Sequence, residues 1–334
     1  MITPNAREAI HGITGIMLFS TRCCFLPISS RKNKGYVCKS TRVRLVVRSI
    51  ITKISSRGKT LMLKTRQLFS WKLSKSMNIN IFVPDDYDPQ ECYPVLYLLH
   101  GYGNSYQGFL PNLKLDYLAQ RMINEGKIVP LIIVAPNIDN SFGLNSSSST
   151  EMLGDAPQQA FYKGLYRDYL IFEVIPYIER HYSTYTDRSY RFIGGASMGG
   201  FAALHAAFHY PELFSKVGGH MPAILLDSSC REFTSWVYPD QEARMERDPI
   251  ALTSVQGLAG LEVYLDCGED DSFQFFTGAK LLHKALQAHG YRSQYHQHPG
   301  GHDDEYLQQH LQDYLLFYAG SRESALNEKE KRNE

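Results

Sequence analysis

Short apolar runs alternate with amphipathic segments along residues 62–320, and this alternation constrains the fold more than any other feature. Four runs are apolar almost throughout, at residues 94–101, 130–136, 191–195 and 261–268. A strand that is apolar on both faces is typical of a parallel sheet buried between layers of helices. Apolar side chains at three- and four-residue spacing predict helices at residues 165–182, 276–290 and 304–318. We therefore predict an α/β fold with a mostly parallel central sheet and helices on both faces.

Local patterns add three further predictions about this domain. Residues 68–74 and 78–84 alternate apolar and polar side chains, which predicts antiparallel strands with one exposed face. In the helix predicted at residues 165–182, the apolar face includes Tyr169, Phe172 and Ile175, and Pro176 is expected to cause a kink. Two irregular segments, residues 137–163 and 222–248, are expected to shape the substrate site because loops at strand ends usually do so.

Charge divides the chain into two chemically different parts. The 334 residues have a net charge of +1, but residues 1–61 contain twelve Lys or Arg against the single acid Glu8. This basic segment has neither the interleaved aromatic residues nor the amphipathic period of a dedicated binding helix. We expect a disordered leader, or residues ahead of the working start, rather than a site for nucleic acid or anionic membranes. Residues 62–320 then form the folded domain, and residues 321–334 form a charged tail.

Hydropathy and cysteine spacing bear on the compartment. No stretch reaches the roughly 18 consecutive apolar residues that a membrane span needs. The best signal-peptide candidate, residues 10–19, has a weak positive region before it and is followed by TRCC instead of a small-residue cleavage site. The six cysteines show no C-x-x-C spacing, which suits free thiols in a reducing compartment. We expect a cytoplasmic protein without a membrane span, with secretion as the alternative.

The segment RFIGGASMGGFAALHAAF, residues 191–208, places four glycines around one serine, between a strand pattern and a helix pattern. Gly195, Ser197 and Gly199 form the pattern G-x-S-x-G, which requires a strand before it and a helix after it. Glycine weakens strand and helix interiors, so the four glycines indicate a turn too sharp for side chains, with Gly200 allowing the helix to pack closely. The pattern predicts that Ser197 is the nucleophile of an acyl-transfer enzyme; an incidental serine on a structural turn is the alternative.

A serine hydroxyl attacks well only when a base removes its proton, and an acid must orient that base. His302 lies on a glycine-rich loop between a predicted strand and the last helix, so we predict that it is the base. Asp271 comes three residues after Gly268, where the chain has left the sheet, and we predict that it is the acid. Asp270 is its main competitor, and a helix cap is the structural alternative for Asp271. The order Ser, Asp, His along the chain is expected for an α/β-hydrolase sheet.

The tetrahedral intermediate of acyl transfer also needs two hydrogen-bond donors at its oxyanion. We predict that the backbone NH of Met198, the residue after the nucleophile, is one donor. The NH of Tyr102, on the loop after the first apolar run, is the other. His100 is expected to be a structural hydrogen-bonding residue rather than a second base.

In this order and spacing, the segments LLHGYG, GGASMGGFAAL, CGEDD and GGHDDEY resemble the esterase D family of α/β-hydrolases, over residues 68–318. That family includes S-formylglutathione hydrolases, feruloyl and acetylxylan esterases, tributyrin-type esterases and mycolyltransferases. The resemblance implies Ser197 as nucleophile, Asp271 as acid and His302 as base, with Tyr102 and Met198 as oxyanion donors. The sequence departs from the family where Asp303 and Asp304 follow the histidine in place of a frequent aromatic residue. Their negative charge is expected to affect the pH response or the charge preference for substrates.

These residues favour a cofactor-independent serine carboxylesterase that cleaves small acyl esters through an acyl-enzyme intermediate. No metal is expected, and no nucleic-acid partner for the catalytic domain. Acyl transfer to an alcohol, or cleavage of a thioester such as formylglutathione, uses the same residues and stays open. A metallohydrolase built on His296, His298, His302 and Asp303 leaves the serine turn unexplained. A non-catalytic binding module is disfavoured by the intact Ser, Asp and His set, and neither the acyl specificity nor the oligomeric state follows from the sequence.

Overall fold

The computed structural model describes residues 63–226, 231–255 and 257–320. The predictions for the basic leader, residues 1–61, and for the charged tail, residues 321–334, lie outside the described residues. Within those described ranges, no helix is long and apolar enough to cross a membrane.

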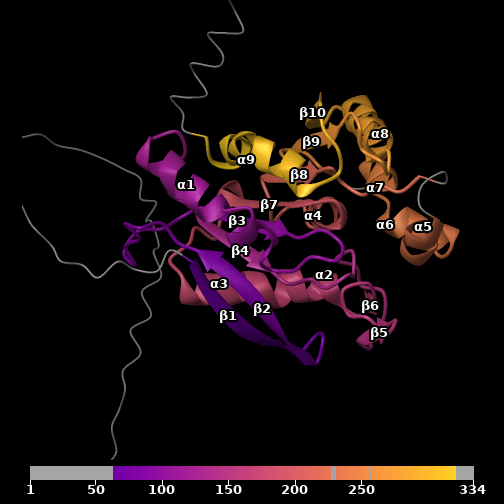
Figure 1. The fold of residues 1–334 in the computed structure, drawn as a ribbon, viewed down its shortest axis with the longest axis horizontal. Helices are drawn as coiled ribbons and strands as arrows, with labels where there is room; N and C mark the ends of the chain where they lie inside the picture. The colour runs from indigo at the N-terminus through magenta and orange to yellow at the C-terminus, as the bar shows by residue number, and fades with distance from the viewer. Residues whose placement is uncertain (1–62, 227–230, 256, 321–334) are drawn as a thin grey trace, which may run out of the picture. The chain divides into compact units, whose positions relative to one another are not determined.

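The described residues form a central eight-stranded sheet with the strand order β1-β2-β4-β3-β7-β8-β9-β10 (Figure 1). The strands are β1 (Leu63–Ser70), β2 (Lys75–Phe82), β3 (Val95–Leu99), β4 (Ile132–Pro136), β7 (Arg191–Ala196), β8 (Lys216–His220), β9 (Glu262–Gly268) and β10 (Arg292–His298). From β4 to β10 all neighbours in this order pair in parallel, whereas β1 pairs antiparallel with β2, and β2 with β4. The mostly parallel sheet is therefore confirmed. The strand predicted at residues 68–74 lies earlier, because β1 ends at Ser70 and the next four residues turn into β2.

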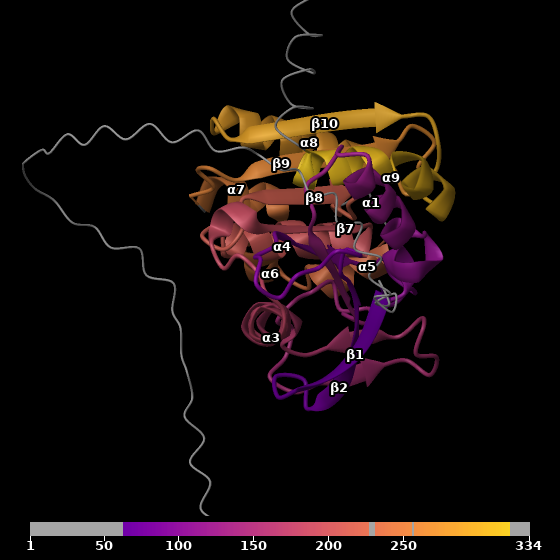
Figure 2. The same ribbon diagram turned by 90° about the vertical axis from the view of Figure 1, so that its left-hand side faces the viewer.

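Helices cover both faces of this sheet (Figure 2). On one face, α1 (Leu115–Asn124) and α9 (Asp304–Ala319) pack in one apolar cluster with Leu96 and Leu98. The opposite face packs Tyr97 and Leu99 in a second cluster with α3 (Ile175–His181), α4 (Met198–His209), α7 (Pro249–Val255) and α8 (Phe275–Ala288). Successive side chains of a strand point to opposite faces, which explains why the continuously apolar runs fill both cores.

The remaining elements are short and lie in the segments that connect the strands. They are the hairpin of β5 (Glu151–Leu153) and β6 (Phe161–Lys163), the helices α2 (Tyr166–Tyr169), α5 (Arg231–Val237) and α6 (Gln241–Arg247), the kinked turn Gly108–Asn112, the π-helical turn Leu170–Val174, and the 3₁₀ turn Arg188–Tyr190. The hairpin and the helices α5 and α6 lie in the two irregular segments, residues 137–163 and 222–248, that were expected to shape the substrate site.

The helix predicted at residues 165–182 is interrupted by the π-helical turn Leu170–Val174. Pro176 has no N–H to donate to the carbonyl of Phe172, and its ring crowds that turn, so the helix widens just before the proline. Phe172 lies within this wider turn and its side chain is 51% exposed, so its predicted place in the buried face is wrong. Tyr169 and Ile175, on either side of the turn, are buried as predicted.

Candidate active site

Ser197 occupies a strained turn between β7 and α4. Its backbone φ is 55° and its ψ is −116°, a combination that residues other than glycine rarely adopt. The serine N–H donates to the His220 carbonyl at 2.8 Å, and the serine carbonyl accepts from the N–H groups of Phe201 and Ala223 at 3.0 Å. These three hydrogen bonds hold the turn in its strained conformation.

Glycines on both sides of Ser197 leave the space that this turn needs. A Cβ atom on Gly199 would lie 2.1 Å from the carbonyl oxygen of Leu99, and one on Gly195 would lie 2.5 Å from the same oxygen. The prediction of a turn too tight for side chains is therefore confirmed at these two positions. Gly194 serves another purpose, because its Cβ would lie 1.9 Å from the hydroxyl oxygen of Tyr318 on α9.

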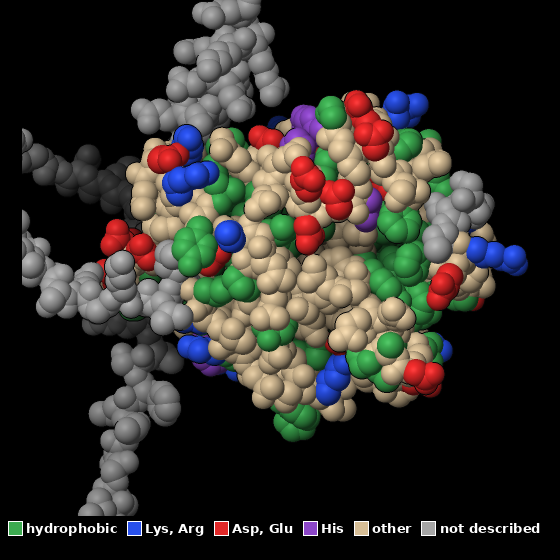
Figure 3. Space-filling model, in the orientation of Figure 1, with side chains coloured by type: hydrophobic (Ala, Val, Ile, Leu, Met, Phe, Trp, Pro, Cys, Tyr) green, Lys and Arg blue, Asp and Glu red, His purple; other side chains and the backbone are tan. Residues whose placement is uncertain are grey.

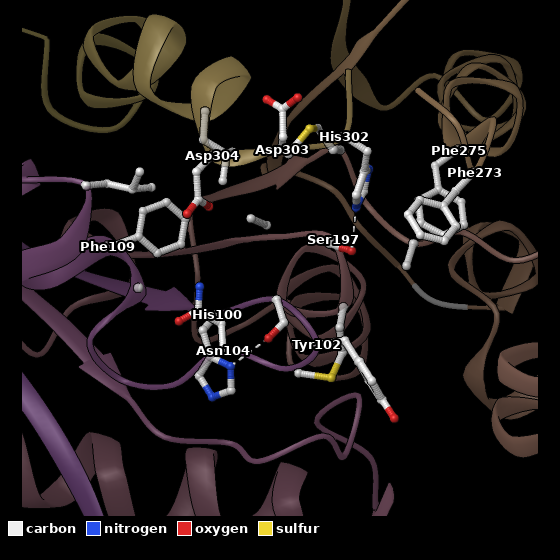
Figure 4. Close-up of a pocket in the computed structure, with 18 of the residues that line it drawn as sticks. His100, Tyr102, Asn104, Phe109, Ser197, Phe273, Phe275, His302, Asp303 and Asp304 are labelled. Atoms are coloured by element: carbon white, nitrogen blue, oxygen red, sulfur yellow. Dashed lines mark hydrogen bonds between the residues drawn. The ribbon is translucent and has the colours of Figure 1, made fainter. Parts of the chain in front are cut away.

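The structure brings Ser197, His302 and Asp271 together. His302 Nε2 lies 2.8 Å from Ser197 Oγ (Figure 4), and His302 Nδ1 lies 3.0 Å from Asp271 Oδ2. The three residues follow β7, β10 and β9, whose carboxyl ends meet at one edge of the parallel sheet. The Asp271 side chain is fully buried and that of His302 is 11% exposed, whereas the competitor Asp270 is exposed.

The hydrogen bonds of Asp271 determine which nitrogen of His302 carries the proton. A carboxylate only accepts hydrogen bonds, so His302 carries its proton on Nδ1 and leaves Nε2 free to accept the serine proton. Asp271 Oδ1 also accepts the N–H of Phe273 at 2.8 Å. The cap residue of α8 is Gln274, so the helix-cap alternative for Asp271 is wrong. The rings of Phe273 and Phe275 lie edge-on to the imidazole, with centroids at 5.0 and 5.2 Å.

The two residues that were predicted to supply oxyanion donors lie close to the serine turn. Met198 is the first residue of α4, so its N–H has no partner within the helix, and the positive end of the helix dipole lies at this point. Tyr102 lies on the loop after β3, where a Cβ on Gly101 would contact Ser197 Cβ at 3.5 Å. The Tyr102 hydroxyl donates to the Gln159 carbonyl, which anchors this loop. Both predicted oxyanion donors thus line the same cavity as Ser197.

His100 links the loops on the other side of this cavity. Its Nδ1 donates to the Gly101 carbonyl at 2.9 Å, and its Nε2 accepts the N–H of Ile138 at 3.0 Å. Burial lowers the pKa of its imidazole, which favours the neutral ring that these two bonds require. His100 is therefore a structural hydrogen-bonding residue, as predicted.

A cavity of about 240 Å³ opens at Ser197. Its walls are mainly apolar and include Phe109, Leu113, Phe142, Met221, Ala223, Phe233, Phe273 and Leu307. Three of these residues come from the irregular segments that were expected to shape the substrate site. Asp303 and Asp304 also line the cavity, and no described lining residue is Lys or Arg. On the surface, Figure 3 shows hydrophobic side chains gathered beside a hollow, with acidic side chains above it.

His296 and His298, two histidines of the metallohydrolase alternative, make ring contacts away from Ser197. The rings of His296 and His298 stack on each other along β10, and His298 also stacks on His310 at 4.3 Å between centroids. Asp303 accepts the N–H of Tyr306 and caps α9. Among the residues that the structure describes, no group of three or more His, Cys, Asp or Glu side chains is arranged to hold a metal ion.

Comparison with known proteins shows the family of the chain. The family model described as "Putative esterase" matches residues 70–318. The endo-1,4-beta-xylanase/feruloyl esterase of Xylanibacter ruminicola is 28% identical over 238 residues, which are 67% of this chain and 31% of that protein. The chain thus spans about a third of the length of this curated relative.

Solved structures share the fold of the described domain. A ferulic acid esterase is similar with a TM-score of 0.65 and 24% identity, covering 77% of this chain and 96% of that one. An S-formylglutathione hydrolase from Agrobacterium tumefaciens is similar with a TM-score of 0.63 and 18% identity, covering 78% and 96%. At these identities the likeness shows the α/β-hydrolase fold. Because the family model spans nearly the whole of this domain, the chain belongs to the esterase family.

Proposed function

We propose that this protein is a serine carboxylesterase that hydrolyses small acyl esters through an acyl-enzyme intermediate. The observation that carries the proposal is the unbroken contact from Asp271 through His302 to Ser197 Oγ at the floor of an apolar cavity. Membership of the esterase family supports the same reaction class. The reaction is assigned to the domain of residues 62–320.

In the proposed reaction Ser197 attacks, Asp271 orients the imidazole, and His302 acts in turn as base and acid. His302 Nε2 takes the hydroxyl proton as Ser197 Oγ attacks the ester carbonyl carbon, and Asp271 stabilises the imidazolium that forms. The N–H groups of Met198 and Tyr102 donate to the oxyanion, where one such donor contributes about 10²- to 10³-fold in rate. When the intermediate collapses, the ester C–O bond breaks and His302 protonates the leaving alcohol. Water then attacks the acyl-enzyme while His302 takes its proton, and His302 returns that proton to Ser197 Oγ as the carboxylic acid leaves.

The charge of the cavity favours neutral esters over the thioester alternative. The carboxylates of Asp303 and Asp304 line it, without a Lys or Arg among the described lining residues. Formylglutathione carries carboxylates of its own, which these side chains repel. We therefore place ester hydrolysis before thioester cleavage, which uses the same three residues. We also propose a reducing compartment such as the cytoplasm, which Cys92 and Cys267, both free thiols, support.

The test is a substrate panel with the parent and with Ser197→Ala. Turnover of p-nitrophenyl acetate, butyrate and longer esters is measured beside formylglutathione, with and without an added alcohol as acyl acceptor. We expect hydrolysis of the neutral esters, its loss in Ser197→Ala, and a nearly unchanged melting temperature. Comparable activity in the variant would contradict the nucleophile assignment, and faster turnover of formylglutathione than of every neutral ester would contradict the substrate class.

A further inference from the structure

Four buried polar side chains form a network between the sheet and helix α9, near the serine turn. They are His220 on β8, Asp266 on β9, and Tyr314 and Tyr318 on α9, and each is at most 3% exposed. His220 Nδ1 lies 3.0 Å from Asp266 Oδ1, and the Tyr314 hydroxyl donates to Asp266 Oδ2 at 2.7 Å. His220 Nε2 lies 3.1 Å from the Tyr318 hydroxyl. The proposed reaction uses none of these four groups.

A buried polar network contributes no more stability to a core than well-packed apolar side chains often do. A buried carboxylate needs every one of its partners, and well-packed apolar side chains of similar size are often at least as stable. Burial and the charge of Asp266 raise the pKa of Tyr314 well above its ordinary value, so this phenol stays neutral and donates. Removing any member leaves a buried polar group without its partner. The network therefore indicates a requirement other than bulk stability.

Two glycines in neighbouring strands make room for one member of the network. A Cβ on Gly194 would lie 1.9 Å from the Tyr318 hydroxyl oxygen, and a Cβ on Gly218 would lie 2.0 Å from it. Gly194 on β7 is only three positions before Ser197. Because Gly194 and Gly218 have no side chains, the Tyr318 hydroxyl can lie against the sheet and contact His220.

The backbone of the same residues holds the serine turn. The His220 carbonyl accepts the N–H of Ser197 at 2.8 Å, and the Asp266 carbonyl accepts the N–H of Met221 at 2.8 Å. In the sheet register, His220 is the partner of Ala196, the last residue of β7. Any rotation of the His220 backbone therefore moves the nucleophile directly.

The helix α9, which carries the two tyrosines, begins next to His302. α9 starts at Asp304, two residues after His302, with Asp303 as its cap. Tyr314 and Tyr318 attach this helix to β9 and β8, the two strands that support the serine turn and the loop of Asp271. One set of hydrogen bonds thus connects the elements that carry the serine, the acid and the histidine.

We propose that the network of His220, Asp266, Tyr314 and Tyr318 positions Ser197 and His302 relative to each other for proton transfer. This inference rests on the proposed function. Its members are positioning residues, because they touch neither the substrate nor the reacting atoms. A misplacement of about 1 Å between reacting groups can reduce the rate about 10²-fold, so small changes in the network should be visible in kcat.

The test uses Tyr318→Phe and Asp266→Asn in the full chain, with Tyr97→Phe as matched control. Tyr97 is a fully buried tyrosine on β3 whose hydroxyl has no hydrogen-bond partner among the residues that the structure describes, so its removal breaks no described network. Values of kcat, KM and melting temperature are measured with p-nitrophenyl butyrate, and active sites are counted with a fluorophosphonate. We expect kcat per active site to fall about ten-fold or more in both network variants, with KM within about two-fold. Tyr97→Phe should keep the parent kcat.

The outcomes separate this inference from the proposed function. If kcat per active site of Tyr318→Phe stays within two-fold of the parent, even with a lower melting temperature, the network is only structural and the inference is overturned. Tyr318→Phe decides the question if Asp266→Asn does not fold, because it removes a single hydroxyl. A parent without Ser197-dependent turnover would instead refute the proposed function, and the inference with it.

Discussion

Replacing Asp271 by Asn should disable the base by reversing the tautomer of His302. Asp271 Oδ1 accepts the Phe273 N–H at 2.8 Å, and this bond requires an oxygen at that position in the variant as well. The amide NH₂ must then face His302 Nδ1, 3.0 Å away in the parent, and it can only donate there. The imidazole proton moves to Nε2, where it points at the serine oxygen instead of accepting the serine proton.

We expect kcat to fall about 10³- to 10⁴-fold at neutral pH, with little change in KM, as expected for an acid whose loss gives the wrong tautomer. Stability should fall by only about 1.5–3 kcal/mol, the usual contribution of a hydrogen bond to a charged group. The assay is turnover of p-nitrophenyl butyrate beside urea unfolding. Asp270→Asn is the matched control, since this neighbouring carboxylate is exposed. A kcat in Asp271→Asn above one tenth of the parent value would refute the reasoning, as would an equal loss in Asp270→Asn.

Three further predictions concern packing, charge and pH. In Gly199→Ala the new Cβ would lie 2.1 Å from the Leu99 carbonyl oxygen. This substitution should lower the free energy of unfolding by about 1–3 kcal/mol and slow labelling of Ser197 by a fluorophosphonate. An unchanged urea midpoint would contradict this prediction. Asp304→Asn should raise kcat/KM for an anionic ester such as p-nitrophenyl hemisuccinate about two- to five-fold relative to p-nitrophenyl butyrate. Glu305→Gln, outside the cavity lining, should leave that ratio unchanged. Burial lowers the pKa of His205 well below its ordinary value of 6.5, so the folded state binds fewer protons than the unfolded state. The urea midpoint should therefore fall as the pH drops below about 6.5, and less steeply in His205→Gln; an equal slope in both would argue against His205 as the source.

Local patterns were sufficient for the parts of the site that depend on neighbours in sequence. The serine turn and the loop that carries His302 were each predicted from a short stretch of sequence. The structure places the side chains of Ser197 and His302 in contact. Asp271 and Asp270 are adjacent and equally acidic, so only the loop conformation after β9 separates the buried carboxylate from the exposed one. That conformation depends on contacts with the histidine loop, which no local pattern encodes.

The predictions that were wrong or incomplete depend on contacts between distant segments. Phe172 was expected to be buried because a regular helix was assumed, and the π-helical turn before Pro176 changes the direction of its side chain. Gly194 was assigned to the serine turn, yet its missing side chain makes room for Tyr318, more than a hundred residues later. The network around His220 was not predicted. The spacing of Tyr314 and Tyr318 by four residues on one helix face was the available signal.

The proposed reaction requires a covalent bond between the substrate acyl group and Ser197. The most direct measurement is mass spectrometry of the protein quenched in acid during turnover of p-nitrophenyl butyrate, followed by digestion and sequencing of the modified peptide. We expect a butyryl group on Ser197 and no adduct in Ser197→Ala. Turnover without any acylated residue, or with the acyl group on another side chain, would contradict the proposed reaction.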